Sequence, residues 1–172
     1  MPVREILLLG NPRLYETSLD LKPSDIELIQ STVEDLHDTL MDFRKKFGLG
    51  RAIAAPQIGV MKRLIYMHID APTVIINPFI TLKSKEMMEV WDDCMSFPEL
   101  FVKVYRHREC RINFLDLNWQ ETHLDLKGDL SELLQHEYDH LDGILAVSRA
   151  INGRSFCLRR QNNPLTGRTM KI

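Results

Sequence analysis

The segment His136-Glu137-Tyr138-Asp139-His140 constrains the fold more than any other part of the chain. The apolar residues around it recur at helical spacing, and Gly143 follows, which predicts a helix from about Asp129 to Leu141. Two histidines four residues apart project from one face of such a helix, where they can bind a single metal ion. The glutamate between them has the position of the general base in H-E-x-x-H sites. The alternative is a surface helix that carries these residues by chance.

A catalytic metal site needs a third protein ligand and one open position. Ala146 stands where the last histidine of the longer H-E-x-x-H-x-x-G-x-x-H motif would be, and no glutamate or histidine follows His140. Asp142 is too close along the helix to turn back, and Cys157 has no supporting motif. Cys94 is the better candidate, because a thiolate with two imidazoles suits a divalent transition metal. The alternative for Cys94 is a lone buried thiol.

Catalysis also needs a donor for the oxyanion, and the segment Ala54-Ala55-Pro56-Gln57-Ile58-Gly59 can supply one. Its small residues let the backbone approach a substrate closely, and the proline fixes the direction of the chain. Gln57 can donate an N–H group without adding a charge. In isolation the segment also fits a simple turn that enters a strand.

The rest of the chain predicts an α+β fold, with antiparallel sheets packed around the metal-bearing late helix and a long helix near the amino terminus. Apolar residues at alternating three- and four-residue spacing predict that long helix over 24–47, with a Ser24-x-x-Glu27 capping box and a stop at Gly48 and Gly50. Short β-rich runs between residues 60 and 117 predict antiparallel strands, which are Arg63–Met67, Thr73–Asn77, Met87–Trp91, Val102–Tyr105 and Arg111–Leu115.

Length and charge favour one domain over residues 1–172, with a basic tail over about 150–172. The formal net charge of −2 gives no overall reason to bind DNA or an anionic membrane, and no apolar run is long enough to span a bilayer. Three cysteines cannot all pair, so each is interpreted as a thiol in a reducing compartment. We therefore expect a cytoplasmic protein without a membrane partner.

Three segments in register resemble the motifs of the peptide deformylase family. They are Gly50-Arg51-Ala52-Ile53-Ala54-Ala55-Pro56-Gln57, Asp92-Asp93-Cys94-Met95-Ser96 and Gln135-His136-Glu137-Tyr138-Asp139-His140. Ile6-Leu7-x-x-Gly10-Asn11-Pro12 and Leu141-Asp142-Gly143 are similar to that family as well, so the resemblance covers roughly residues 4 to 148. Together these segments are far more specific than H-E-x-x-H alone.

The resemblance implies that Cys94, His136 and His140 hold the metal and that Glu137 is the acid and base. Gln57 and the backbone N–H of Met95 would form the oxyanion hole. The metal in such enzymes is typically Fe²⁺, with Zn²⁺, Ni²⁺ or Co²⁺ as substitutes, and we place Zn²⁺ second. The chain departs from the family pattern at Ala52, Asp92 and Asp93, which bears on substrate fit, and Asp92 can still pair with Arg106.

The implied reaction is removal of the formyl group from the N-terminal methionine of newly made peptides. The alternatives are an amidohydrolase of the same kind with another substrate, a metallopeptidase, and a binding protein that keeps the metal as a structural staple. Intact Glu137 and Gln57 argue against the staple.

The residues expected beside the substrate are Gly50, Arg51, Ala52, Asp92, Asp129 and Glu132. Helical spacing puts Asp129 and Glu132 on the side of His136, where the family generally has apolar residues for the methionine side chain. Arg51 stands where the family usually has an aliphatic residue. The alternative is that Asp129 and Glu132 only cap the helix.

Residues 143–172 contain six basic residues and no acidic residue. An enzyme of nascent chains could use them for a transient contact with ribosomal RNA, which salt-sensitive co-sedimentation would test. A solvated tail is the favoured interpretation, because the spacing of these charges is scattered.

Overall fold

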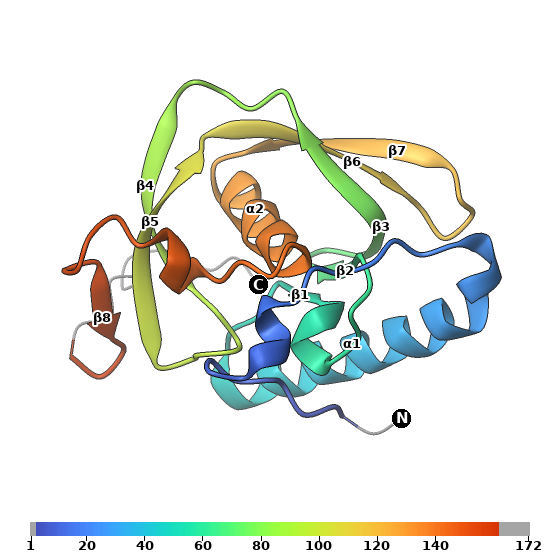
Figure 1. The fold of residues 1–172 in the computed structure, drawn as a ribbon, viewed down its shortest axis with the longest axis horizontal. Coiled ribbons are helices and arrows are strands. Elements are labelled where there is room, and N and C mark those ends of the chain that lie inside the picture. Colours follow the sequence, from blue (N-terminus) through green and yellow to red (C-terminus); the bar gives the residue numbers. More distant parts are fainter. Residues whose placement is uncertain (1–2, 162–172) are drawn as a thin grey trace.

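The computed structural model, in which residues 3–161 are described, wraps two antiparallel sheets around a short helix, and a longer helix lies along one side (Figure 1). The first sheet has the strand order β1-β2-β3-β6-β7 and the second has the order β4-β5-β8. Thus the α+β class with antiparallel sheets is confirmed. No helix in the described range is long and apolar enough to cross a membrane.

The first sheet separates the two helices. It consists of β1 (Ala52–Ala54), β2 (Leu64–His68), β3 (Pro72–Thr81), β6 (Glu109–Leu115) and β7 (Glu121–Lys127). Successive side chains of a strand point to opposite faces, so Ile65 and Met67 join the core with the second helix, whereas Leu64 and Tyr66 join the core with the first. Strands β1 and β7 were not predicted, although β7 shows the alternation Thr122, Leu124, Leu126.

Helix α1 (Ile26–Phe47) covers one face of this sheet, and its buried positions Ile29, Leu36, Leu40 and Phe43 confirm the predicted periodicity. It ends at Gly48, whose φ of +67° is the left-handed conformation expected of a helix stop. The prediction of a capping box that begins at Ser24 was wrong, because the N-cap residue of α1 is Asp25. Residues Pro23–Asp25 form the 3₁₀ turn η2 instead, because the Asp25 carboxylate accepts a hydrogen bond from the Lys22 N–H at 3.0 Å.

Helix α2 (Asp129–Leu141) has the bounds that the sequence predicted, and Figure 1 shows it enclosed by strands. Its apolar residues Leu133, Leu134 and Leu141 pack against the first sheet. Its polar residues His136, Glu137, Asp139 and His140 are buried as well. A helix of this length that buries so many ionisable groups needs specific partners for them.

The second sheet consists of β4 (Met87–Asp93), β5 (Leu100–His107) and β8 (Phe156–Leu158). Three short 3₁₀ turns join other elements, namely η1 (Pro12–Tyr15), η3 (Ala55–Ile58) and η4 (Ala146–Arg149). The tail expected over about 150–172 is not irregular throughout, because Phe156–Leu158 pair with Leu100–Val102 of β5. Residues 162–172 of that tail lie outside the described range.

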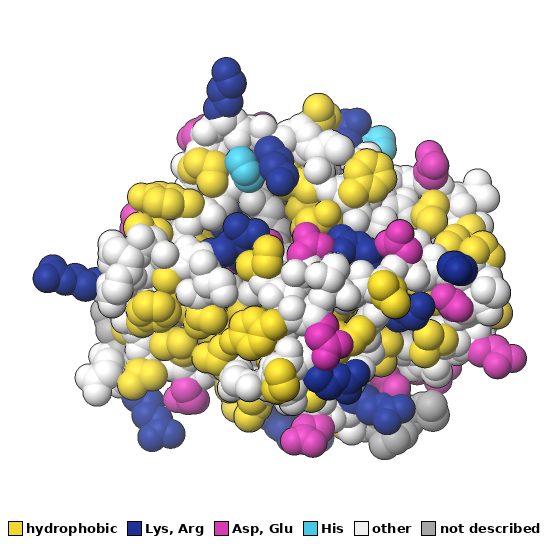
Figure 2. Space-filling view, viewed as in Figure 1, with side chains coloured by type: hydrophobic (Ala, Val, Ile, Leu, Met, Phe, Trp, Pro, Cys, Tyr) yellow, Lys and Arg dark blue, Asp and Glu magenta, His cyan; other side chains and the backbone are white. Residues whose placement is uncertain are grey.

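Three basic residues of the carboxyl-terminal segment are engaged within the protein. Arg149 pairs with Asp139, Arg159 with Asp93 and Arg160 with Glu99. On the face drawn in Figure 2, cationic and anionic side chains are interspersed, and no single sign of charge dominates. This distribution agrees with the small net charge of the sequence.

A substitution at Gly143 would test how tightly the end of α2 packs against the Tyr15 backbone. Its φ is +69°, and an added Cβ would lie 2.4 Å from the backbone oxygen of Tyr15. Because both the strained φ and the clash with backbone oppose a side chain, Gly143→Ala should lower the free energy of unfolding by roughly 2–4 kcal/mol. Denaturant unfolding of the metal-loaded protein measures this.

Gly153→Ala is the matched control, because nothing lies within 4 Å of an added Cβ at that position and its φ is not in the left-handed region. It should change stability by less than about 0.5 kcal/mol. Equal stabilities for the two variants would show that the contact with Tyr15 is not tight.

Candidate metal centre

The side chains of Cys94, His136 and His140 meet in the interior. Cys94 directly follows β4, and the two histidines lie one turn apart on α2. The Cys94 Sγ atom is 3.3 Å from Nε2 of His140, which is 3.2 Å from Nε2 of His136. All three potential ligand atoms lie within 4.8 Å of one another, and all three residues are buried. These are the residues that the sequence grouped as ligands.

A metal ion fits this donor set. Two imidazole nitrogens and a sulfur face one another, and such acceptor atoms stay close only if a proton or a cation lies between them. Burial lowers the pKa of His136, but the nearby Asp92 and Cys94 outweigh burial and raise it well above its ordinary value. The surroundings of the His136 ring therefore favour a positive charge. Burial and the neighbouring His136 hold the pKa of His140 well below its ordinary value, which keeps that imidazole neutral, as a metal ligand must be.

Asp92 orients the imidazole ring of His136 through a contact with its Nδ1 atom. Its Oδ1 lies 2.7 Å from Nδ1 of His136, which leaves Nε2 of the ring toward Cys94 and His140. Burial raises the pKa of Asp92, but His136 and Arg106 outweigh burial, so its net pKa is well below the ordinary value. Asp92 is therefore an ion that neighbouring positive charges hold in place.

Arg106 connects Asp92 to the helix. Its guanidinium donates to Asp92 Oδ2 at 2.7 Å and to Asp139 Oδ2 at 2.5 Å. Asp139 also accepts two hydrogen bonds from Arg149, both at 2.6 Å. The sequence suggested the pairing of Asp92 with Arg106, and the structure confirms it. The sequence did not predict the hydrogen bonds of Asp139 with Arg106 and Arg149, because contacts between separate segments leave no periodic signal.

Glu137 lies in the same buried region. Burial raises its pKa to about 7, against the lowering effect of His136 and with smaller effects from Asp92 and Arg51. Its Oε2 atom has no hydrogen-bond partner among residues 3–161. A carboxyl group with a pKa near neutrality can both accept and return a proton.

Gln57 directs its amide N–H group toward the cluster. Its Oε1 accepts a hydrogen bond from the Ala54 N–H at 2.9 Å, which fixes the orientation of the amide. Its Nε2 then lies 3.6 Å from Cys94 Sγ and 3.3 Å from Ser96 Oγ. The Ser96 N–H also donates to Cys94 Sγ, at 3.4 Å. The Cys94 sulfur therefore faces two N–H donors, one from the Gln57 side chain and one from the Ser96 backbone.

The expected substrate residues fall at several places around this centre. Ala52 begins the edge strand β1 and is buried, and Gly50 and Arg51 precede it with partial exposure. The charge of Arg51 contributes to the pKa of Glu137, so Arg51 lies near the centre. Met95 is buried, and its Sδ would be 3.9 Å from a Cβ at Gly50.

At the start of α2, Glu132 is buried whereas Asp129 is exposed. Gly128 is the N-cap residue and has no side chain to bond, so Asp129 is not the N-cap that the capping alternative required.

The fold and this centre define the class of the protein as a metal-dependent hydrolase with a Cys-His-His site and a buried glutamate. A family model described as polypeptide deformylase matches residues 3–155. The chain belongs to the peptide deformylase family.

Individual relatives agree with this assignment. A peptide deformylase from Pseudothermotoga lettingae is 35% identical over 159 residues, which is 92% of this chain and 90% of that protein. Peptide deformylase 1 from Prochlorococcus marinus is 35% identical, over 91% of this chain and 85% of that protein. The crystal structure of the Thermotoga maritima peptide deformylase superposes with a TM-score of 0.80 at 27% identity, and the match covers 88% of this chain and 100% of that one.

The third ligand can be tested by metal content. Cys94→Ala should lose most of its bound metal, because only two imidazoles would remain from the protein. Cys157→Ala is the control and should keep one equivalent, since Cys157 is not part of the cluster. Metal is measured by elemental analysis after dialysis of anaerobically prepared protein. Stoichiometric metal in Cys94→Ala would mean that another residue is the third ligand.

Proposed function

We propose that the chain hydrolyses the formyl group from the N-terminal methionine of newly made peptides. The observation that carries this proposal is the meeting of three groups at one buried place: the Cys-His-His cluster, the unpaired Glu137 oxygen and the Gln57 amide. In addition, a Synechococcus elongatus peptide deformylase of the same fold, with a TM-score of 0.80, was solved in complex with actinonin. An Acinetobacter baumannii relative at 25% identity was solved with Met-Ala-Ser bound.

Cys94, His136 and His140 would hold the divalent metal, which supplies Lewis acidity to the formyl carbonyl and to a water molecule. Glu137 removes a proton from the attacking water as its oxygen bonds to the formyl carbon. The Gln57 Nε2–H and, in our proposal, the Met95 N–H donate to the oxyanion that develops. Glu137 then returns the proton to the leaving amine as the C–N bond breaks, and formate and the free amino terminus result.

Fe²⁺ is the ion we propose first and Zn²⁺ second, since a thiolate with two imidazoles suits either. The peptide would lie as an added strand beside Gly50, Arg51 and Ala52, because β1 is an edge strand that, within residues 3–161, pairs only with β2. A cytoplasmic location and the ribosomal contact stay predictions. Half of the six basic charges assigned to that contact are already paired within the protein.

Glu137→Gln tests the chemistry. The amide cannot take up the proton, so the rate of formate release from formyl-Met peptides should fall by on the order of 10²–10⁴, while the metal stays bound. Formate is assayed with a coupled dehydrogenase, and metal content is measured on the same sample. Activity within about tenfold of wild type would remove Glu137 from its role. Cleavage of unformylated peptides by the wild type would favour the metallopeptidase alternative.

We further propose that the preference for methionine is weaker than usual for the family. Glu132 is buried four residues before His136, and Arg51 adds a charge near Glu137. Burying a methionine side chain contributes roughly 1.5–3 kcal/mol, and a carboxyl group in the pocket wall removes part of that.

Accordingly, Glu132→Leu should raise kcat/KM for formyl-Met peptides about tenfold relative to formyl-Lys and formyl-Gln peptides. Glu132→Gln is the matched control, because it removes the charge but not the shape. A strong methionine preference in wild type that neither variant changes would leave Glu132 outside the substrate pocket.

A further inference from the structure

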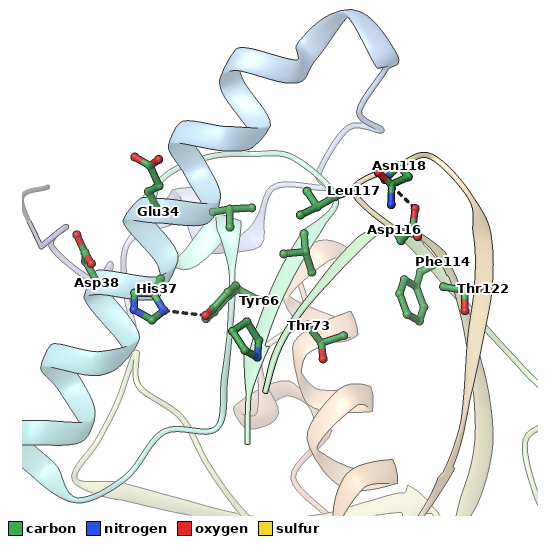
Figure 3. Close-up of a pocket in the computed structure, with 13 residues that line it drawn as sticks. Glu34, His37, Asp38, Tyr66, Thr73, Phe114, Asp116, Leu117, Asn118 and Thr122 are labelled. Carbon is green, nitrogen blue, oxygen red and sulfur yellow. Dashed lines mark hydrogen bonds between the residues drawn. The ribbon is translucent and has the colours of Figure 1, made fainter. Parts of the chain in front are cut away.

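Two pockets open on different faces of α1. The larger pocket, of about 800 Å³, lies between α1 and the first sheet, and Figure 3 shows Glu34, His37 and Asp38 of α1 on one side of it. None of the residues assigned to the metal centre or to the peptide path lines that pocket. The smaller pocket, of about 420 Å³, lies at the carboxyl-terminal end of α1 and is lined in part by Met95. Only the smaller pocket therefore adjoins the candidate site.

Three segments form the smaller pocket, namely the amino-terminal residues, the last turns of α1 and the loop that follows β4. Figure 1 shows the amino-terminal segment, in dark blue, running along the carboxyl-terminal half of α1. The apolar lining includes Val3, Ile6, Leu8, Phe43, Phe47 and Met95. The side chains of Val3, Leu8 and Phe47 are about half exposed, at 48%, 59% and 49%. An apolar occupant would cover these three side chains and remove their surface from water.

The charges at the rim of the smaller pocket are mostly paired. Lys46 Nζ lies 2.6 Å from the Asp42 carboxylate, and Arg4 Nε lies 2.8 Å from the Asp35 carboxylate. Glu5 is the remaining charged residue of the lining, and it is exposed. A carboxylate that entered the pocket would lose hydration and be repelled by Glu5. The pocket thus favours an apolar group over an anionic one.

The path proposed for the peptide leads toward this pocket. Gln57 closely follows β1, and its Nε2 lies 3.6 Å from Cys94 Sγ, so the formyl end of a bound peptide lies at the carboxyl end of β1. The Arg51 oxygen bonds to β2, and alternation therefore leaves the backbone groups of Ala52 facing the free edge. A peptide along this edge runs antiparallel to β1 and toward Gly50. Because a strand rises about 3.3 Å per residue, roughly the fourth or fifth residue of the peptide reaches Gly50.

The peptide path and the pocket meet at Gly50. A Cβ atom at Gly50 would lie 3.6 Å from Phe43 Cδ1 and 3.9 Å from Met95 Sδ, and both of these side chains line the pocket. The Gly50 oxygen accepts hydrogen bonds from Arg44 Nε at 3.0 Å and from Nη2 at 2.9 Å. Since this oxygen is already engaged, an added strand cannot continue past Gly50 in the same pattern. The peptide would leave β1 there, beside the pocket.

We infer that the smaller pocket binds an apolar side chain of the substrate peptide, at about its fourth or fifth residue. The inference rests on the proposed hydrolysis, because one peptide occupies both the metal centre and the pocket. It adds a determinant of specificity that lies outside the pocket for the first side chain. The residues that carry it are Phe43, Phe47 and Met95 on one side and Val3 and Leu8 on the other.

Hexapeptides test the inference on the full-length, metal-loaded protein. The reference is formyl-Met-Ala-Ser-Ala-Ala-Ala with an amidated carboxyl terminus, and the test peptides carry a single Leu or Asp at the fourth or the fifth residue. At one of these positions, Leu should raise kcat/KM for formate release about three- to tenfold over Asp, through a lower KM at unchanged kcat. Equal values for Leu and Asp at both positions would overturn the inference and leave the hydrolysis in place. If none of the peptides releases formate, the proposed function fails, and the inference fails with it.

Variants locate the preference, which is expressed relative to the reference peptide in the same protein. Phe47→Ala and Leu8→Ala should each reduce the preference for Leu to less than about twofold, and both replace exposed side chains. Leu28→Ala is the matched control, because Leu28 is an exposed apolar residue of α1 outside the pocket lining, and it should keep the preference. Phe47→Lys should shift the preference toward Asp, whereas Leu28→Lys should not. Equal effects at Leu28 and Phe47 would overturn the site.

A second copy of the chain is the other occupant that the apolar lining could accept. Sedimentation velocity of wild type and Phe47→Ala distinguishes it from the peptide. A dimer that Phe47→Ala abolishes, together with an unchanged preference for Leu, would assign the pocket to a contact between copies and overturn the inference. A monomer in both proteins, with the preference lost in Phe47→Ala, would support it.

Discussion

The rest of the structure depends on the ion pairs that the buried guanidinium of Arg106 forms with Asp92 and Asp139. Only 3% of its side chain is exposed, and it lies between Asp92 at the end of β4 and Asp139 of α2. Removing one partner of a buried ion pair typically costs about 3–5 kcal/mol, because the remaining charge is left uncompensated. The triad thereby fixes the second sheet against α2. Since Asp92 also contacts His136, the same interaction sets the orientation of a candidate metal ligand.

The amino-terminal segment contacts both Gln57 and the loop around Cys94. The Leu7 N–H donates to the backbone oxygen of Gln57 at 2.8 Å, and the Leu9 N–H donates to the backbone oxygen of Ser96 at 2.9 Å. Upstream, the Arg4 side chain pairs with Asp35 of α1 at 2.8 Å. Gln57 and the loop around Cys94 are therefore held together by a segment that is itself anchored on α1. This explains how a helix far from the candidate chemistry contributes to the geometry of the centre.

Local periodicity explains which elements the sequence predicted. Helix α2 was placed with its observed bounds, and α1 was two residues too long because Asp25 forms a tighter turn with Lys22. The grouping of Cys94 with the two histidines followed from coordination chemistry, since two imidazoles required a third donor. Strands β1 and β8 are three residues long, too short for a period to show, and depend on partners distant in sequence. The contacts of Asp139 with Arg106 and Arg149 were out of reach for the same reason.

Among the buried polar atoms that lack a hydrogen-bond partner, some belong to the metal centre and others, such as Ser18 Oγ and Asp35 Oδ1, lie elsewhere in the protein. Within residues 3–161, Oε2 of Glu137 and Nδ1 of His140 are buried without a hydrogen-bond partner. Each such atom costs about 1–3 kcal/mol, so an interior optimised for stability alone would have apolar or paired groups there. The same burial raises the pKa of Glu137 to about 7, where a carboxyl group can exchange a proton in both directions. The cost in stability and the expected acid–base role of Glu137 thus have one physical origin, the exclusion of water from α2.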